Sequence, residues 1–382
     1  MSFLDEILKY PTDEVLSRIE AKSGADVEQA LGLERLRVDD FMALLSPAAA
    51  PYLETMAGKA HRLTRQRFGN NILMYAPLYL SNLCTNGCLY CGFNATNKVP
   101  RQTLAFDEIE REAQVLYDRG FRHILLVTGE APHAVNNDYL AEAAQRIRHL
   151  FSSIAIEVYP MEESGYRQMV EAGVDGLTIY QETYDRTLYA DMHPFGRKRD
   201  YSFRLLAPER GGAAGLRRIG IGALLGLGHF RVESFYTGLH ALYLSRHYWR
   251  SHLSVSFPRM RPAEGGFAPL HPVSDREFVQ LICALRLLLP DAGLVMSTRE
   301  SATLRDNLLP LGITQMSAGS CTSPGGYAGP EESTRQFNID DDRSAAEVEE
   351  MIRSKGYEAV WKDWDRAFLD RATPYATSDA AL

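Results

Sequence analysis

Three cysteines stand close together in one short stretch of the chain. Cys84, Cys88 and Cys91 have the spacing C-x3-C-x2-C and make up three of the five cysteines in the 382-residue sequence. Thiolates on one loop are typical ligands of an iron–sulfur cluster, and every iron of a four-iron cube needs a ligand. Three cysteines therefore leave one iron open to bind a small molecule and to act on it.

The alternatives to a cluster are a zinc site, a disulfide framework or inert thiols. A structural zinc site usually combines two pairs of ligands, and the sequence has no second cysteine pair. Nothing in the sequence marks the chain as secreted, so disulfides are not expected. Cys283 lies on an apolar helical face and is expected in the core, and the lone Cys321 is expected to take part in packing and not to be a ligand.

The motif resembles that of the radical S-adenosylmethionine (radical SAM) enzymes, because an aromatic residue, Tyr90, precedes its last cysteine. In that family the amino and carboxylate groups of SAM bind the open iron. The resemblance implies two cofactors, SAM and one 4Fe–4S cluster on Cys84, Cys88 and Cys91. It also implies an electron donor, of the flavodoxin or ferredoxin type, for reductive cleavage of SAM to methionine and a 5′-deoxyadenosyl radical.

The elements that must position this loop follow a regular rhythm. From residue 72 onward, apolar runs of strand length alternate with longer amphipathic runs, which is typical of β–α–β units and a parallel sheet. About eight such units indicate a closed (β/α)8 barrel of the TIM type. The predicted strands are Ile72–Leu83, His123–Val127, Ile154–Tyr159, Gly176–Tyr180, Arg218–Leu225, Leu253–Phe257, Leu294–Ser297 and Ile313–Ser317.

The rest of the α/β chain is expected to flank this barrel. Residues 1–70 are predicted to form an N-terminal helical extension, residues 71–330 the barrel, and residues 331–382 a C-terminal helical cap and tail. Trp361 and Trp364 in the cap are expected to pack against the barrel.

Functional side chains of such barrels lie at the C-terminal ends of the strands, and the cysteine loop follows the first strand as this rule requires. Polar groups also follow other strands. Glu157 lies in an apolar strand, where an unpartnered carboxylate would be costly to bury. Together with the resemblance, these positions predict contacts to SAM by Tyr90, Thr128, Gly129, Glu130, Glu157, Gln181, Glu182, Arg204, Gly222 and Leu225.

Several of these residues have a plainer explanation. The segment 128–130 resembles the glycine-glycine-glutamate element of radical SAM barrels, with threonine in the first position, but it also fits an ordinary strand-to-helix turn. Arg204 is expected either to bind the SAM carboxylate or to form a surface salt bridge. The glycine-rich stretch 220–228 resembles the segment beside the SAM adenine, and close packing of strand and helix is its alternative.

The substrate site is predicted from the last two strands. The guanidinium fork of an arginine binds two carboxylate oxygens at once, so Arg299 is predicted to hold a substrate carboxylate. Pairing of Arg299 with Glu300 or another acid is the alternative. Ser317, after the eighth strand, is predicted to add a hydroxyl to the same site.

Several segments resemble one branch of the radical SAM family, the aromatic amino-acid lyases, and most closely the tyrosine lyases of thiamine biosynthesis. The hydrogenase-maturation relatives in this branch carry further cysteines near the C-terminus, whereas no cysteine follows Cys321 here. The matching segments are Leu125–Ala131, Tyr180–Tyr184, Val255–Arg261, Ser297–Ser301, Pro324–Tyr327 and Val360–Asp365.

This resemblance implies cleavage of the Cα–Cβ bond of L-tyrosine to 2-iminoacetate and 4-methylphenol, and association with the thiazole synthase that uses the unstable product. A lyase of the hydrogenase-maturation or tryptophan type is the alternative within the branch, since nothing in the sequence alone fixes the aromatic ring. A non-catalytic iron–sulfur sensor is the alternative outside it.

The overall composition excludes some partners. The net charge of −8 argues against binding to nucleic acid and to anionic membrane surfaces. The first residues lack the pattern of a signal peptide, and no apolar run approaches the ~20 residues of a membrane span. We therefore expect a cytoplasmic protein, in a compartment that keeps thiols reduced.

Overall fold

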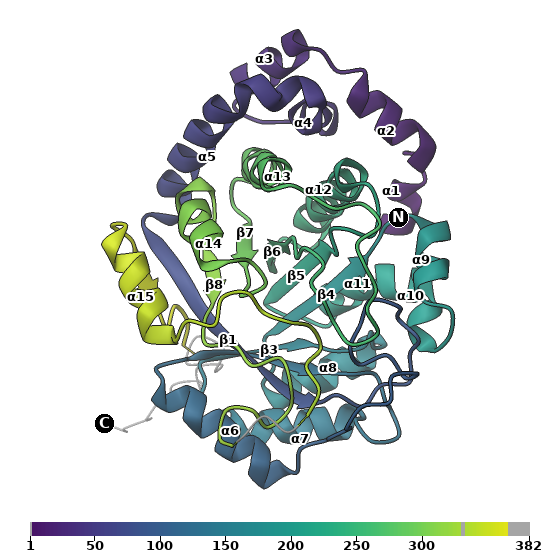
Figure 1. Ribbon diagram of the computed structural model, residues 1–382, viewed down its shortest axis with the longest axis vertical. Coiled ribbons are helices and arrows are strands. Elements are labelled where there is room, and N and C mark those ends of the chain that lie inside the picture. Colours follow the sequence, from purple (N-terminus) through teal and green to yellow (C-terminus); the bar gives the residue numbers. More distant parts are fainter. Residues whose placement is uncertain (1, 330–332, 366–382) are drawn as a thin grey trace, which may run out of the picture.

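Eight parallel strands close into a barrel in the computed structural model, which describes residues 2–329 and 333–365 (Figure 1). Each strand pairs with the next, and β8 pairs with β1 from Leu73↔Gln315 to Tyr75↔Ser317, which closes the barrel. All eight predicted strands are present, and the predicted fold is confirmed. They are β1 (Asn71–Ser81), β2 (His123–Thr128), β3 (Ser153–Glu157), β4 (Gly176–Glu182), β5 (Arg218–Ala223), β6 (His252–Ser256), β7 (Gly293–Met296) and β8 (Gln315–Ser317).

Helices surround the barrel, and their apolar faces supply the outer part of the core. α6 (Phe106–Asp118) buries Ile109, Ala113 and Leu116, which recur at helical spacing. α8 (Glu163–Ala172) is followed by Gly173, which has the left-handed φ of 100° that glycine adopts without strain. The other helices of this ring are α7 (Asn137–Ile147), α8 (Glu163–Ala172), α9 (Arg186–Met192), α10 (Tyr201–Leu205), α11 (Ala207–Ala213), α12 (Phe230–His247), α13 (Asp275–Leu288) and α14 (Ala302–Leu308).

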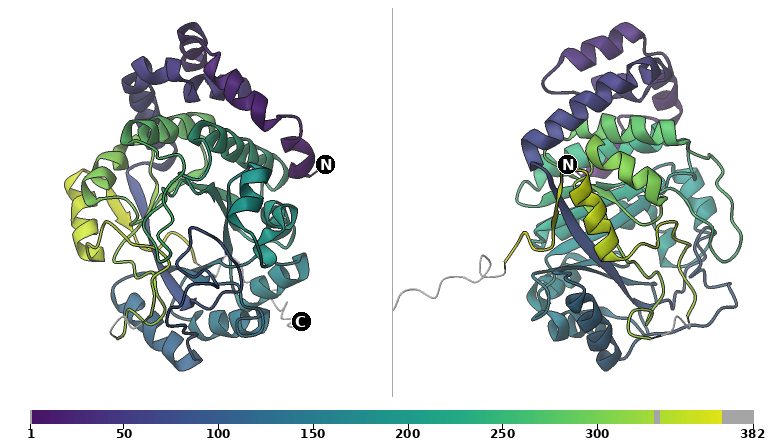
Figure 2. Two further views of the ribbon diagram at one scale, coloured as in Figure 1. Left: turned by 45° about the vertical axis from the view of Figure 1, so that its right-hand side comes forward. Right: turned by 60° about the vertical axis from the view of Figure 1, so that its left-hand side comes forward.

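The N-terminal residues form a helical layer over α12 and α13, as both views of Figure 2 show. Phe41 of this layer packs where Gly238 of α12 leaves room, because a β-carbon at Gly238 would overlap the Phe41 ring and crowd Leu288. The extension therefore shares its core with the barrel. Its elements are α1 (Phe3–Ile7), α2 (Thr12–Glu20), α3 (Gly24–Gly32), α4 (Val38–Leu45), the 3-10 helix η1 (Pro47–Tyr52) and α5 (Leu53–Phe68).

The C-terminal segment combines a helix with a strand that was not predicted. After α15 (Ala345–Ser354), β9 (Glu358–Val360) pairs in parallel with the first residues of β1. Trp361 packs edge-on against Phe121 at 5.1 Å between ring centroids, and Arg217 lies 3.9 Å from the Trp364 ring centroid. Both tryptophans thus pack against the barrel, as expected, at the N-terminal ends of the strands. The predicted tail beyond Asp365 lies outside the described residues.

Across the described residues 2–329 and 333–365, none of the helices has the length and apolar character that crossing a membrane would require.

Candidate active site

The three motif cysteines lie on the loop that follows β1, at the C-terminal mouth of the barrel. Cys84 and Cys91 are half-buried and pack against an apolar cluster that includes Tyr79 and Leu125, while Cys88 is buried. Burial raises the pKa of Cys88 to about 12 and that of Cys91 to about 11. Both groups are therefore neutral thiols unless a bound metal displaces their protons, as metal coordination does.

The donor chemistry of these thiols fits an iron–sulfur cluster. A four-iron cube places each thiolate on a different iron, so its ligands need not converge on one point. The donor set, three thiols from one loop, is the set that such a cube with one open iron requires.

The end of β2 holds the first half of the cysteine loop. The backbone N–H and the hydroxyl of Thr85 donate to the carbonyl of Glu130 at 2.8 Å and 2.9 Å. Asn86 Nδ2 donates to Glu130 Oε2 at 2.7 Å. A β-carbon at Gly129 would overlap the carbonyl of Leu83, so only glycine lets the loop approach this closely. Gly129 and Glu130 lie at the predicted place, where their observed contacts brace the loop.

The segment after α9 holds the second half of the loop. Leu89 N donates to the carbonyl of Met192 and Gly87 N to that of Phe195, each at 3.2 Å. The Tyr90 hydroxyl lies 2.8 Å from His193 Nε2, and Nδ1 of the same ring lies 2.7 Å from the carbonyl of Tyr189. His193 therefore has both ring nitrogens satisfied, as expected of a structural histidine.

A charged cluster lies beside this segment at the end of β4. Glu182 has a φ of 72°, the one positive φ outside glycine in the described residues, where the register of β4 shifts. It accepts from Lys198 Nζ at 2.6 Å and from Arg204 Nη2 at 3.3 Å. Burial alone would raise the pKa of Glu182, but the charges of Lys198 and then Arg204 outweigh it and hold the pKa below its usual value.

Arg204 forms the salt bridge of the alternative prediction, with Glu182, but this pair is buried and does not lie at the surface. Arg204 Nε also donates to the carbonyl of Tyr180 at 2.6 Å. Lys198 was not among the predicted site residues, because its partner Glu182 is distant in the sequence. The position of Lys198 in the basic triplet 197–199 is the sequence feature that could have identified it as a site residue.

Two predicted SAM contacts are buried without a hydrogen-bond partner among the described residues. These are the hydroxyl of Thr128, at the end of β2, and the side-chain amide of Gln181, on β4. A buried polar group without a partner costs about 1–3 kcal/mol, so these two side chains fit a site completed by a polar ligand.

Two further predicted SAM contacts on the next strand take part in packing. A β-carbon at Gly222 would overlap the carbonyl of Ser256 on β6. Leu225 N donates to the carbonyl of Pro258, and the carbonyl of Leu225 accepts from Met260 N, both at 2.8 Å. Strand packing thus accounts for Gly222, and a contact of either residue with SAM stays a prediction.

A cavity opens at the mouth of the barrel and brings Glu157, Arg299 and Ser317 together. Burial raises the pKa of Glu157 to about 7, and the nearby charge of Arg299 acts against this rise. Ser317 Oγ accepts from Thr298 N at 3.2 Å, and Tyr75 lines the same cavity. One part of the lining is aromatic and apolar and includes Tyr75, Pro77, Tyr79, Leu125, Val127, Tyr180, Phe257, Phe278, Val295, Met296 and Phe337. The other part is polar and includes Ser256, Ser297, Thr298, Glu300, Ser320 and Thr322.

Arg299 forms no ion pair with any residue that the structure describes, and its guanidinium carbon lies 3.3 Å from the centroid of the Phe337 ring. The alternative partner Glu300 is held instead by Arg259, whose Nε lies 3.0 Å and 3.1 Å from its two carboxylate oxygens. The alternative pairing of Arg299 with Glu300 is therefore wrong.

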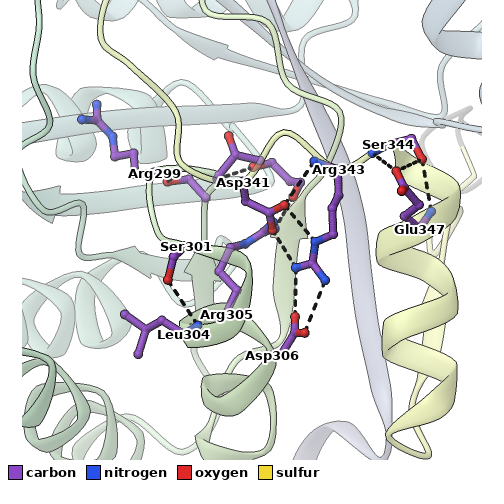
Figure 3. Close-up of polar contacts among 12 residues, drawn as sticks. Arg299, Ser301, Leu304, Arg305, Asp306, Asp341, Arg343, Ser344 and Glu347 are labelled. Carbon is purple, nitrogen blue, oxygen red and sulfur yellow. Dashed lines mark hydrogen bonds and ion pairs between the residues drawn. The ribbon is translucent and has the colours of Figure 1, made fainter.

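Behind Arg299, a buried ionic network ties the C-terminal segment to α14. Asp341 binds Arg305 and Arg343, and Arg343 Nη2 reaches Asp306 at 2.9 Å. The side chain of Arg299 points away from this group (Figure 3). Asp341 N donates to the carbonyl of Thr298 at 3.2 Å, so the network fixes the backbone next to Arg299.

The two remaining cysteines lie outside the motif loop. Cys283 is buried in the core on α13, as expected. Cys321 is half-buried, and its sulfur lies 3.2 Å from Ser323 Oγ.

Comparisons with known proteins agree with this geometry. The model of the radical SAM superfamily matches residues 78–233, and that of the biotin and thiamin synthesis associated domain matches residues 256–358. The chain is 47% identical over 373 residues to the 2-iminoacetate synthase of Escherichia coli K12, covering 97% of this chain and 99% of that protein. The 2-iminoacetate synthase of Salmonella typhimurium LT2 is 46% identical over 373 residues, with the same coverage.

A crystal structure of HydG, a maturase of the FeFe-hydrogenase, has the same fold with a TM-score of 0.87 and 29% sequence identity. The match covers 94% of this chain and 82% of the HydG chain.

Proposed function

Because the chain belongs to the 2-iminoacetate synthase family of radical SAM enzymes, we propose that it cleaves the Cα–Cβ bond of L-tyrosine to give 2-iminoacetate and 4-methylphenol. It is a carbon–carbon lyase that uses a 4Fe–4S cluster and SAM. The observation that supports the choice of substrate class is the position of Arg299, which has no ion-pair partner among the described residues and lines a partly aromatic cavity beside the cysteine loop. A cation at the mouth and apolar walls below it suit an aromatic amino acid.

Cys84, Cys88 and Cys91 would hold the cluster. When bound, the cluster and SAM supply a 5′-deoxyadenosyl radical, which takes a hydrogen atom from the amino group of the substrate. The chain binds and orients both molecules and keeps water from the reactive species.

The proposed SAM contacts differ in how strongly the structure supports them. Thr128 and Gln181 have the strongest support, because their buried polar atoms lack partners in the described residues. Glu182 and Arg204 form a buried ion pair, and we propose that the polar atoms that this bond does not use contact SAM. We propose that the other predicted contacts line the same site, at Tyr90, Gly129, Glu130, Gly222 and Leu225.

The substrate would lie across Glu157 and Arg299. We propose that the Arg299 fork binds the tyrosine carboxylate and that Glu157 accepts a hydrogen bond from the amino group, a different ligand from the SAM predicted from the sequence. Ser317 would contribute through Thr298 N, because this contact fixes the backbone that carries Arg299.

The atom balance of this reaction determines how many electrons a donor must supply. 2-Iminoacetic acid and 4-methylphenol together contain the atoms of tyrosine. The hydrogen atom that the adenosyl radical takes from the substrate must therefore be replaced by one electron and one proton. With the electron that cleaves SAM, each turnover takes up two electrons from a donor.

A hydrogenase-maturation function is the second candidate, and the HydG structure is the observation that favours it. It is weaker, because identity to HydG is 29% against 47% for the E. coli 2-iminoacetate synthase. A non-catalytic sensor would have no use for the amino-acid cavity.

We further propose that the protein works in the cytoplasm, where reducing conditions preserve the thiols of the motif. We propose that it delivers 2-iminoacetate to a thiazole synthase, since an imine of this kind is hydrolysed by water. The N-terminal helices and the region of Trp361 and Trp364 are the surfaces proposed for that contact.

Anaerobic incubation with SAM, dithionite and tyrosine tests the reaction. The expected products are 5′-deoxyadenosine, 4-methylphenol and glyoxylate from hydrolysis of 2-iminoacetate. Deoxyadenosine without 4-methylphenol would reject tyrosine cleavage and spare the radical SAM chemistry. A protein that binds no SAM at its cluster would reject both.

A further inference from the structure

Two apolar side chains are exposed on the outer side of the cysteine loop. Leu89, between Cys88 and Cys91, is 38% exposed, and Phe195 is 42% exposed. The Phe195 ring lies directly against Gly87, where a β-carbon would overlap it. The inner side of the same loop faces the barrel, since Cys84 and Cys91 pack against the cluster that contains Tyr79 and Leu125.

The charge of this region is opposite to that of the whole chain. Residues 84–101 and 191–200 together contain five lysines and arginines and two aspartates, although the chain has a net charge of −8. The segment 84–101 contains no acidic residue. A positive region on an acidic protein is suited to attract an acidic partner.

Two of these cations are exposed beside Phe195. The 3-10 turn η2 (Arg197–Arg199) follows Gly196, and Arg197 and Arg199 form no ion pair with any residue in the described ranges. Lys198 between them is turned inward to Glu182. The nearby Asp200 is engaged at the start of α10, where its carboxylate accepts from Phe203 N at 2.9 Å.

We propose that Leu89, Phe195, Arg197 and Arg199, here called the outer patch, bind a small acidic one-electron carrier protein. The proposal rests on the proposed function, because that reaction takes up two electrons from outside. A carrier on the outer patch contacts the loop that holds the cluster ligands. Substrate and SAM bind on the other side of this loop, at the mouth of the barrel. Exposed apolar groups with a basic rim suit the small, transient interfaces of redox partners.

The test compares a protein reductant with a chemical one. The double variant Arg197→Glu with Arg199→Glu is mixed anaerobically with reduced flavodoxin, an acidic carrier, and bleaching of the cluster absorbance is followed in stopped flow. We expect the bimolecular rate to fall roughly 10-fold or more, as loss of electrostatic steering predicts. Reduction by dithionite, which needs no docking surface, is expected to match the wild type.

The matched control is Arg246→Glu with Arg250→Glu. These exposed arginines lie at the C-terminal end of α12 and just beyond it, at the far end of the barrel. This variant has the same change in net charge and is expected to react with flavodoxin nearly as the wild type does. Equal losses in the two double variants would overturn the proposal, because they would show an effect of overall charge.

A second measurement covers the case in which the double variant fails to hold its cluster. In the wild type, the flavodoxin-driven rate should fall steeply with ionic strength while the dithionite-driven rate stays nearly constant. A flavodoxin rate that ignores salt would contradict the outer patch. The outer patch would also be contradicted if flavodoxin reduced the double variant at the wild-type rate while the variant had lost self-association or binding to a thiazole synthase.

Failure of the docking proposal and failure of the proposed function give different results. Cluster bleaching is read without tyrosine and without product, so it reports docking whatever the substrate is. Normal dithionite-driven formation of 4-methylphenol with unchanged flavodoxin rates would overturn the outer patch alone. Absence of 4-methylphenol with weakened flavodoxin rates would overturn tyrosine cleavage alone.

Discussion

Arg259 holds the carboxylate of Glu300 with its guanidinium, Nε lying 3.0 Å and 3.1 Å from the two oxygens. This pair leaves the preceding residue, Arg299, without its nearest acid, because Glu300 is the acidic residue closest to Arg299 in the sequence. Arg299 is left without an ionic partner in the described residues and lines the cavity beside Glu157. The proposal that Arg299 binds the substrate carboxylate depends on the pairing of Glu300 with Arg259 and not with Arg299.

Replacing Arg299 is expected to weaken tyrosine binding. Arg299→Met removes two charge-assisted hydrogen bonds and should lower kcat/KM for tyrosine by about 2–3 kcal/mol, or roughly 30- to 150-fold. Arg299→Lys keeps the charge but not the fork and should recover part of the loss. Steady-state 4-methylphenol formation measures both, with the exposed Arg353→Met as the control. An unchanged KM for tyrosine in Arg299→Met would contradict the clamp.

The acid limb of the pH profile is expected to report Glu157. Burial raises its pKa to about 7, so the carboxylate that accepts from the substrate amino group is present above that pH and is protonated below it. kcat/KM for tyrosine should fall as the pH drops through about 7. Glu157→Gln should show a lower kcat/KM without this dependence. An identical acid limb in the variant would assign the titration to another group.

Breaking the buried pair of Arg305 and Asp341 is expected to destabilise the fold. Asp341→Asn leaves the buried Arg305 without its counter-ion, which typically costs about 3–5 kcal/mol. The midpoint of urea unfolding should fall clearly, and KM for tyrosine should rise because Asp341 N supports Thr298. Glu349→Gln breaks an exposed pair with Arg353 and should cost less than about 1 kcal/mol. Equal midpoints for the two variants would refute this role.

Gly129→Ala is expected to displace the cysteine loop. A β-carbon there would overlap the carbonyl of Leu83 and lie 3.0 Å from Cys84 Cβ. Iron and sulfide per chain after anaerobic reconstitution should therefore fall. Gly32→Ala is the matched control, since a β-carbon at Gly32 meets nothing within 4 Å. Full cluster content in Gly129→Ala would mean that the loop adapts without loss of its ligands.

The barrel could be predicted because each strand is a local apolar run between turn signals. All eight strands were found, and most ends lie within two residues of the predicted ones. β9 was missed because it lies outside the alternation of strands and helices that forms the barrel, and it exists through its pairing with β1. Local sequence patterns therefore predict the barrel architecture, whereas a short strand such as β9 forms through pairing with a segment that is distant in the sequence.

The residues of the candidate site also differ in how well local sequence patterns predict them. The cysteines are a local motif and were predictable with their spacing. Lys198 and Arg259 act on Glu182 and Glu300, which lie far away in the sequence, and no local pattern identifies those pairs. Gly222 fits both a ligand contact and strand packing from sequence alone, and the carbonyl of Ser256 accounts for it through packing.

The central claim is cleavage of tyrosine at the cavity of Arg299. The most direct test is to incubate the reconstituted, reduced protein with SAM and equal amounts of tyrosine and tryptophan, and to quantify the aromatic products by chromatography. We predict 4-methylphenol in proportion to 5′-deoxyadenosine and no product from the indole ring. An indole product, or deoxyadenosine without 4-methylphenol, would contradict the account.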